Sequence, residues 1–238
     1  MKHFGRTVQR ARHWLRRLVM AVALLALTAV ALDRLFPLPL PDPHKRGATV
    51  VLARDGKPLR AFADQDGVWR YPVTPEQVSP LYVQALLGYE DQWFWRHPGV
   101  NPLALARAAG QWIAHGRIVS GGSTLTMQVA RIIDPNSRTV LGKLHQILRA
   151  LQLEIHLSKR QILTLYLDNA PFGGTIEGVE AASWAYLGKP AEHLSHAEAA
   201  LLAVLPQAPS HMRPDRHPKR ARMARDKVLD RLVEEGIW

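Results

Sequence analysis

The longest apolar stretch of the chain runs from Leu18 to Leu32 and contains no charged residue. No acidic residue precedes it, and six basic residues do: Lys2, Arg6, Arg10, Arg12, Arg16 and Arg17. A basic flank before an apolar segment is typical of a membrane helix whose N-terminus stays in the cytoplasm. We therefore expect residues 1–17 to form a cytoplasmic tail and residues 18–36 a transmembrane signal anchor. The rest of the chain would then lie outside the cytoplasm.

The apolar run is short for a membrane span. Fifteen helical residues cover about 22 Å, whereas the hydrocarbon core of a bilayer is about 30 Å thick. A spanning helix must therefore include the flanking Trp14, Leu15, Leu35 and Phe36. Two alternatives stay open, because Ala29-Val30-Ala31 resembles a signal-peptide cleavage site and Arg16-Arg17 is compatible with a twin-arginine export signal. All three interpretations export the remaining chain, which argues against nucleic acid as a partner of its basic surface.

Prolines mark residues 37–47 as an extended linker, since each proline fixes φ and disfavours helix before it. The folded domain is expected over residues 48–238. Residues 48–53 and 58–63 read as two strands around Asp55-Gly56, which is a hairpin signal, and residues 68–73 predict a third strand. From there on the pattern is helical.

Apolar residues at helical spacing, together with capping signals, predict a series of helices in the remainder. Ser79-Pro80 and Asn101-Pro102 each place a cap before a proline at the first helical position. Ser195 and Glu198 form a capping box before an alanine-rich, buried helix that Pro206 stops. The helices expected are 80–88, 102–114, 139–157, 159–167, 196–205 and 218–235. The predicted fold class is mainly α with a small β entry, behind one N-terminal transmembrane helix.

Composition limits the possible functions. The 238 residues include 31 Lys plus Arg against 20 Asp plus Glu, a net charge of +11, and no cysteine. This length accommodates one domain with an N-terminal tail but not a second large catalytic domain. The absence of cysteine excludes disulfide frameworks, thiolate zinc sites and cysteine nucleophiles.

Polar residues gather in the connections between predicted helices. The first cluster, Glu90 to Gly99, places two adjacent carboxylates among three aromatic residues. Partial burial would raise the pKa of one acid and make it a proton acceptor or donor near neutral pH. The alternative is a solvated helix end beside core aromatics.

In the second cluster, Gly121 to Gln128, two glycines and the hydroxyl residues Ser and Thr precede a predicted helix. Free backbone N–H groups at the start of a helix can bind an anionic or sugar ligand. An ordinary capped turn would have the same sequence. The third cluster comprises Arg131, Arg138 and Lys143, followed one turn later by Gln146. Three cations can hold a pyrophosphate, although such runs are more often solvated basic faces.

In their order, five motifs resemble the peptidoglycan glycosyltransferases of the lysozyme-like glycosyltransferase 51 family. They are EDQWFWRHPG (90–99), GGSTLTMQ (121–128), RTVLGKLHQ (138–146), KRQILTLYLDNAPFGG (159–174) and GVEAASWAYLGK (178–189). The resemblance covers about residues 50–235. The family member whose motif sequences these most resemble normally carries a transpeptidase domain downstream. No Ser-x-x-Lys or Lys-Thr-Gly motif occurs here, so the transpeptidase domain is expected to be absent.

The resemblance implies polymerisation of lipid II into β-1,4-linked glycan, with release of undecaprenyl pyrophosphate. Glu90 matches the family's general base and Asp91 its catalytic neighbour. The remaining positions that match binding or supporting residues are Phe94, His97, Gly122, Ser123, Thr124, Gln128, Arg131, Arg138 and Lys143. The implied partners are lipid II, the growing glycan strand, the inner membrane and other cell-wall synthesis proteins.

The third motif departs from the family pattern Arg-Lys-x-x-Glu, because this chain has Gly142 and Gln146 at its two ends. The position of the second family carboxylate is therefore an amide, which binds a divalent metal less well. We expect no required cofactor and no metal site, and regard a role for Mg²⁺ or Mn²⁺ as doubtful. Two other interpretations stay open. One is a membrane-anchored scaffold that binds lipid II or proteins without turnover. The other is a related enzyme that cleaves glycan strands, which would give the cations of the third cluster no role.

Overall fold

The computed structural model describes residues 2–41, 48–54, 58–115, 122–137 and 139–238, and it divides into one unit up to Pro39 and another from Leu40. The first unit is built on a single helix, α1 (Lys2–Leu35). Within it, the 23 residues His13–Leu35 are apolar and long enough to cross a membrane. At 1.5 Å per residue they cover about 34 Å, so the helix includes the flanking Trp14, Leu15 and Leu35, whereas Phe36 follows its end.

The second unit begins with the expected hairpin. Strands β1 (Thr49–Leu52) and β2 (Pro58–Phe62) pair antiparallel, with Thr49 opposite Phe62 and Val51 opposite Arg60. The Asp55-Gly56 turn between them lies outside the described residues, as do Pro43 and Gly47 of the linker.

The third strand does not join this hairpin. Strand β3 (Trp69–Arg70) pairs parallel with β5 (Ile176–Glu177), which in turn pairs antiparallel with β4 (Pro171–Gly173). The expectation of helices alone beyond residue 73 is therefore wrong at residues 171–177. Strands of two or three residues are too short to give an alternating pattern. An Arg70–Glu177 ion pair accompanies the pairing of β3 with β5.

Helices make up most of the second unit, and the predicted ones are confirmed with ends shifted by at most two residues. They are α2 (Pro80–Glu90), α3 (Pro102–His115), α4 (Leu125–Ile133), α5 (Val140–His156), α6 (Lys159–Asn169), α7 (Val179–Leu187), α8 (His196–Val204), α9 (Pro209–Met212) and α10 (Pro218–Glu234), with short 3₁₀ turns η1 (Pro75–Gln77), η2 (Ala191–His193) and η3 (Leu205–Gln207). The capping box predicted at Ser195 is present. The mainly α fold with a small β entry is confirmed.

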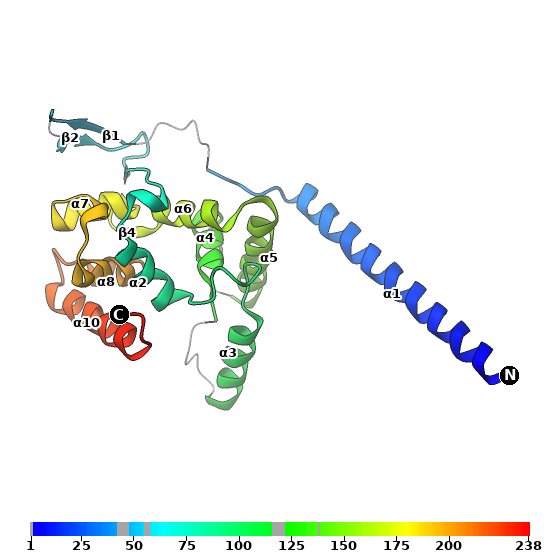
Figure 1. Ribbon diagram of the computed structural model, residues 1–238. Coiled ribbons are helices and arrows are strands. Elements are labelled where there is room, and N and C mark those ends of the chain that lie inside the picture. Colours follow the sequence, from blue (N-terminus) through cyan, green and yellow to red (C-terminus); the bar gives the residue numbers. More distant parts are fainter. Residues whose placement is uncertain (1, 42–47, 55–57, 116–121, 138) are drawn as a thin grey trace. The chain divides into compact units, whose positions relative to one another are not determined.

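Two packed groups of helices form the core (Figure 1). Helix α8 packs against α2 and α10, and α4 packs against α5 and α6. Alanines on α8 let its neighbours approach closely, and fully buried Tyr82 and Leu86 of α2 fill the space against it. The carboxyl end of α2 and the amino end of α4 both border the site described below, because Asp91 just beyond α2 accepts a hydrogen bond from Leu125 at the start of α4.

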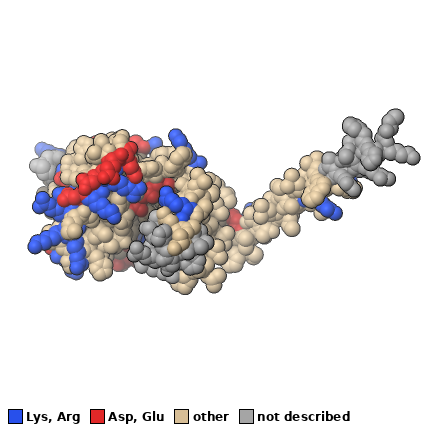
Figure 2. Space-filling model, turned by 90° about the horizontal axis from the view of Figure 1, so that it is seen from below, with Lys and Arg blue, Asp and Glu red and all other residues tan. Residues whose placement is uncertain are grey.

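Charge on the surface is mixed. Figure 2 views the molecule from below, with basic side chains scattered over the visible face of the folded domain and acidic ones among them. On α10, Arg222 lies 3.9 Å from Asp226, and Arg231 lies 2.9 Å from Glu235 just after the helix. Basic and acidic side chains are therefore interspersed on the coloured part of this face.

Candidate active site

Glu90 is the last residue of α2, and its carboxylate lines two neighbouring cavities of about 650 and 590 Å³. These two cavities share Tyr89, Glu90, Arg107, Ser123 and Arg231, and we call them together the cleft. One carboxylate oxygen accepts a hydrogen bond from Gln128 Nε2 at 2.7 Å, and the other from Gln207 Nε2 at 2.6 Å. The carboxylate is therefore held in one orientation where both cavities meet.

The environment of Glu90 shifts its proton affinity. Burial raises the pKa of the Glu90 carboxyl, and the nearby charge of Asp91 adds to this effect. The hydrogen bonds from Gln207 and Gln128 and the positive charge of Arg231 act in the opposite direction, without cancelling the rise. A partly buried carboxyl with a raised pKa, facing a cleft, is a strong candidate for general acid–base chemistry.

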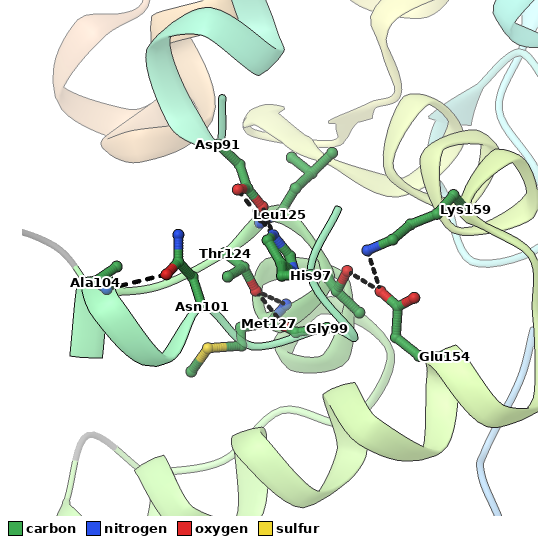
Figure 3. Close-up of polar contacts among 11 residues, drawn as sticks. Asp91, His97, Gly99, Asn101, Ala104, Thr124, Leu125, Met127, Glu154 and Lys159 are labelled. Carbon is green, nitrogen blue, oxygen red and sulfur yellow. Dashed lines mark hydrogen bonds and ion pairs between the residues drawn. The ribbon is translucent and has the colours of Figure 1, made fainter. Parts of the chain in front are cut away.

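Asp91 is buried and has both oxygens occupied (Figure 3). His97 Nε2 lies 2.9 Å from each of them, and the backbone N–H of Leu125 donates to one at 2.8 Å. Thr124 caps α4 by accepting from Met127 N–H at 3.2 Å and donates to the Gly99 carbonyl at 2.5 Å. Asp91, His97 and Thr124 therefore join the loop after α2 to the start of α4.

Phe94 does not reach the cleft. Its ring is fully buried, with Trp95 at 5.0 Å between ring centroids and Lys159 Nζ 4.6 Å from its centroid. Lys159 also pairs with Glu154 (Figure 3). Glu154 in turn accepts a hydrogen bond from Thr126. A side chain without accessible surface contacts no substrate, so the placement of Phe94 among binding residues is corrected to a packing role beneath the loop.

Lys143 supplies a positive charge beside the cleft, where it contacts the lining residues Ser123 and Gln146. Lys143 Nζ donates to Ser123 Oγ at 2.6 Å and to Gln146 Oε1 at 3.0 Å. Burial lowers the pKa of Lys143, and the charge of Arg131 lowers it further. Two cations held this close together form an attractive site for an anion.

Gln146 is fixed at both ends of its amide. Its oxygen faces Lys143, and its nitrogen donates to the Met127 carbonyl at 2.5 Å. A divalent cation at Gln146 Oε1 would have to displace Lys143 or lie against its charge. The residues around Gln146 therefore do not fit a divalent metal site, and the described part of the chain holds no cluster of three His, Cys, Asp or Glu residues that could form one elsewhere.

The structure also explains why position 142 is a glycine. A Cβ atom there would lie 1.9 Å from the Ser137 carbonyl oxygen, so the arginine of the family pattern does not fit without a backbone shift. Gly122 lies in the described chain beside Ser123, whereas Gly121 and Arg138 lie outside the described residues.

The sequence did not identify three residues of the cleft, namely Arg107, Gln207 and Arg231. Arg107 and Arg231 line both cavities, and Gln207 contacts Glu90 directly. They come from α3, η3 and α10, which the motifs do not cover. The sequence offered one weak indication of a functional residue here, because Gln207 is a polar residue in the connection that begins at Pro206.

Comparisons with known proteins agree with the motifs. The transglycosylase family model matches residues 55–233. The chain is 62% identical over 221 residues to penicillin-binding protein 1C of Escherichia coli K12, covering 93% of this chain and 28% of that protein. It is 40% identical over 188 residues to penicillin-binding protein 1A of Pseudomonas aeruginosa, covering 79% of this chain and 22% of that protein. The chain thus spans less than a third of the length of these relatives.

Among solved structures, the 2.6 Å crystal structure of penicillin-binding protein 1A from Haemophilus influenzae is similar, with 23% identity and a TM-score of 0.44. The match covers 81% of this chain and 19% of that one. The family model spans most of the folded domain and includes Glu90, Lys143 and Gln207. The chain therefore belongs to the transglycosylase family, the peptidoglycan glycosyltransferases that its motifs predict.

Proposed function

We propose that this chain is a peptidoglycan glycosyltransferase that polymerises lipid II into β-1,4-linked glycan strands during cell-wall synthesis. The observation that carries the proposal is the Glu90 carboxylate, held where two cavities meet that are also lined by cations. These cations are Arg107, Arg131 and Arg231, and Lys143 bonds to the lining residue Ser123. Two cavities suit two sugar substrates, and the cations suit a phosphorylated one.

In the proposed reaction the 4-hydroxyl of the acceptor GlcNAc attacks C1 of the donor MurNAc. Glu90 takes the hydroxyl proton as the new C–O bond forms, and the bond from C1 to undecaprenyl pyrophosphate breaks. A single displacement inverts the α-linked donor to a β linkage. The raised pKa of Glu90 supports this role, because a base is most effective when its pKa approaches the working pH.

The pyrophosphate leaving group gains one negative charge when its bond to C1 breaks, in addition to the charges that it already carries. We assign Lys143 and Arg131 to it, because Lys143 is already oriented by Ser123 and Gln146, and because burial strengthens its interaction with an anion. Gln146 stands at the position of the second family carboxylate, and its fixed amide orients this lysine. The reaction as proposed therefore needs no divalent cation.

We also place the protein at the inner membrane, where its lipid-linked substrate resides. Helix α1 would anchor it there, with the folded domain on the periplasmic side. Helix α5 carries a stripe of exposed apolar side chains at helical spacing that suits a lipid surface: Val140, Leu144, Leu148, Leu151 and Ile155. Trp93 and Trp95, half exposed on the loop after α2, suit the membrane interface.

The test is incubation of the purified full chain in detergent with fluorescently labelled lipid II, followed by gel electrophoresis of the products. Polymerisation gives a ladder of long glycan strands that a muramidase degrades. Lipid II bound without any ladder would favour the scaffold interpretation. Shortening of added glycan strands would favour a lytic enzyme.

A further inference from the structure

The two hydrogen bonds on Glu90 come from very different parts of the chain. Gln128 lies on α4 inside the second motif, whereas Gln207 lies on η3, seventy-nine residues later and outside all five motifs. Each carboxylate oxygen accepts from one of them, so the two amides hold the carboxylate from two sides.

The backbone before Gln207 is firmly placed. Helix α8 ends at Val204, Leu205 is fully buried, and the Ala208 N–H donates to the Leu205 carbonyl at 3.2 Å, which closes the turn. Because the main chain is anchored in the core, the exposed Gln207 side chain is directed onto Glu90 instead of into solvent. Its contact is thus a consequence of how α8 packs.

We propose that Gln207 is a positioning residue that keeps the Glu90 carboxylate ionised and oriented for proton abstraction. The proposal rests on the proposed function, in which Glu90 is the base. An amide N–H binds a charged carboxylate more strongly than a neutral carboxylic acid, and therefore favours the form that accepts a proton. Burial alone would leave more of Glu90 protonated, and the hydrogen bond from Gln207 is the largest influence that opposes it.

Gln128 and Arg231 also favour the ionised carboxylate, but each lowers its pKa less than Gln207 does. The remaining titratable groups do not share this role at Glu90. Tyr82 and Tyr166 beneath it stay neutral, because burial raises the pKa of both phenols. Arg231 carries a permanent charge, and Asp91 is engaged with His97 and Leu125. The charged and titratable groups near Glu90 or lining its cavities are Tyr82, Tyr89, Asp91, Arg96, His97, Arg107, Arg131, Tyr166 and Arg231, with Lys143 beside Arg131.

The experiment compares pH profiles of kcat/KM for labelled lipid II between wild type and Gln207→Met, using the full chain in detergent. Methionine has the size of glutamine without a donor, so Glu90 should ionise at higher pH. We expect Gln207→Met to lose about tenfold on the acid side of the profile and to recover to within about twofold at the alkaline end. Gln207→Glu adds a like charge beside Glu90 and should move the acid limb further in the same direction.

Gln77→Met is the matched control. Gln77 is an exposed glutamine on η1 whose side chain accepts from Thr74 N–H, and it does not line the cleft. Its profile should match wild type. Thermal unfolding of each variant by circular dichroism checks the fold, and if Gln207→Met does not fold, the profile of Gln207→Glu decides.

Two outcomes would overturn the proposal: an unchanged profile, or a loss that is the same at every pH, as a purely structural role would give. Both require an active wild-type enzyme. A wild type that does not polymerise lipid II under any condition would instead overturn the proposed function.

Discussion

Glu90 shows how a common residue gains a chemical role from its neighbours. A glutamate at a helix end is ordinarily solvated and ionised, with little reason to take a proton at neutral pH. Here partial burial raises its pKa, while Gln128, Gln207 and Arg231 limit the rise. We propose that the balance between these opposing effects makes Glu90 a base that is both available and reactive.

Replacing Glu90 tests this assignment. Glu90→Gln keeps the size of the side chain and both amide neighbours, but removes the proton acceptor. Because general-base catalysis contributes about 10²- to 10⁴-fold, we expect polymerisation to fall at least a hundredfold while lipid II binding and thermal stability persist. Glu234→Gln, at an exposed position of α10, should retain full activity in the same gel assay. More than about a tenth of wild-type activity in Glu90→Gln would rule Glu90 out as the base.

The leaving-group side makes a separate prediction. Lys143→Ala removes a partly buried cation, which should weaken transition-state binding by about 2 to 5 kcal/mol, measured as a drop in kcat/KM. A chelator should change the wild-type rate little, because Lys143 already occupies the Gln146 oxygen.

The matched comparison is Gln146→Glu. This change places a carboxylate oxygen against the Met127 carbonyl, where the wild type has an N–H donor. Two facing oxygens attract a cation, so this variant alone should slow when the chelator is added. A wild-type enzyme that stops in chelator, with Gln146→Glu behaving identically, would contradict our account of the leaving group.

Helix α5 contributes to the site through its start as well as through Lys143 and Gln146. Thr139 caps it by accepting from Gly142 N–H at 3.0 Å, and the chain before it passes so close that position 142 has no space for a side chain. Asp134 after α4 accepts from Arg149 at 2.6 Å and lies 2.9 Å from His145, which joins the two helices beside the site. The position of Lys143 therefore depends on a tight connection between α4 and α5.

Adding one methyl group tests that connection. Gly142→Ala forces the Ser137 carbonyl to move, and overpacking of this kind costs about 1 to 3 kcal/mol. Gly110→Ala is the matched control, since a Cβ atom there meets open space in the middle of α3, and alanine favours a helix by up to about 1 kcal/mol. Thermal unfolding should thus separate the variants in opposite directions. Equal stability of both would show that the close approach at Gly142 is unimportant.

At the scale of the whole molecule, an apolar helix precedes a folded domain whose relatives are penicillin-binding proteins. The length of His13–Leu35 is sufficient for a membrane span, and the exposed apolar stripe on α5 gives the domain a second surface suited to lipid. We propose that both features suit an enzyme whose substrate stays in the membrane.

The anchor interpretation predicts an uncleaved N-terminus. Intact-mass spectrometry of the protein isolated from the membrane fraction should give the mass of a chain that retains residues 18–32. Since a signal peptide is removed during export, a mature N-terminus near Leu32 would contradict the anchor and leave a peripheral enzyme.

The sequence by itself determined the features that depend on neighbouring residues. Helix starts at Ser79, Asn101, Thr139 and Ser158 follow from caps and prolines, which act within one turn, so the predicted ends agree with the structure within two residues. The motif order also identified the family. It identified Glu90, which lines the cleft, and Lys143, which the structure bonds to Ser123 at the cleft wall.

Only the tertiary structure decided the features that join distant segments. The pairing of β3 with β5 links residues more than one hundred positions apart, and Gln207 reaches Glu90 across 117 positions. Burial of Phe94 and the two bonds that fix Gln146 likewise depend on which helices pack together. The local sequence does not predict these contacts. The partners come together because whole elements pack against each other, and the conformational preference of a single residue does not determine that packing.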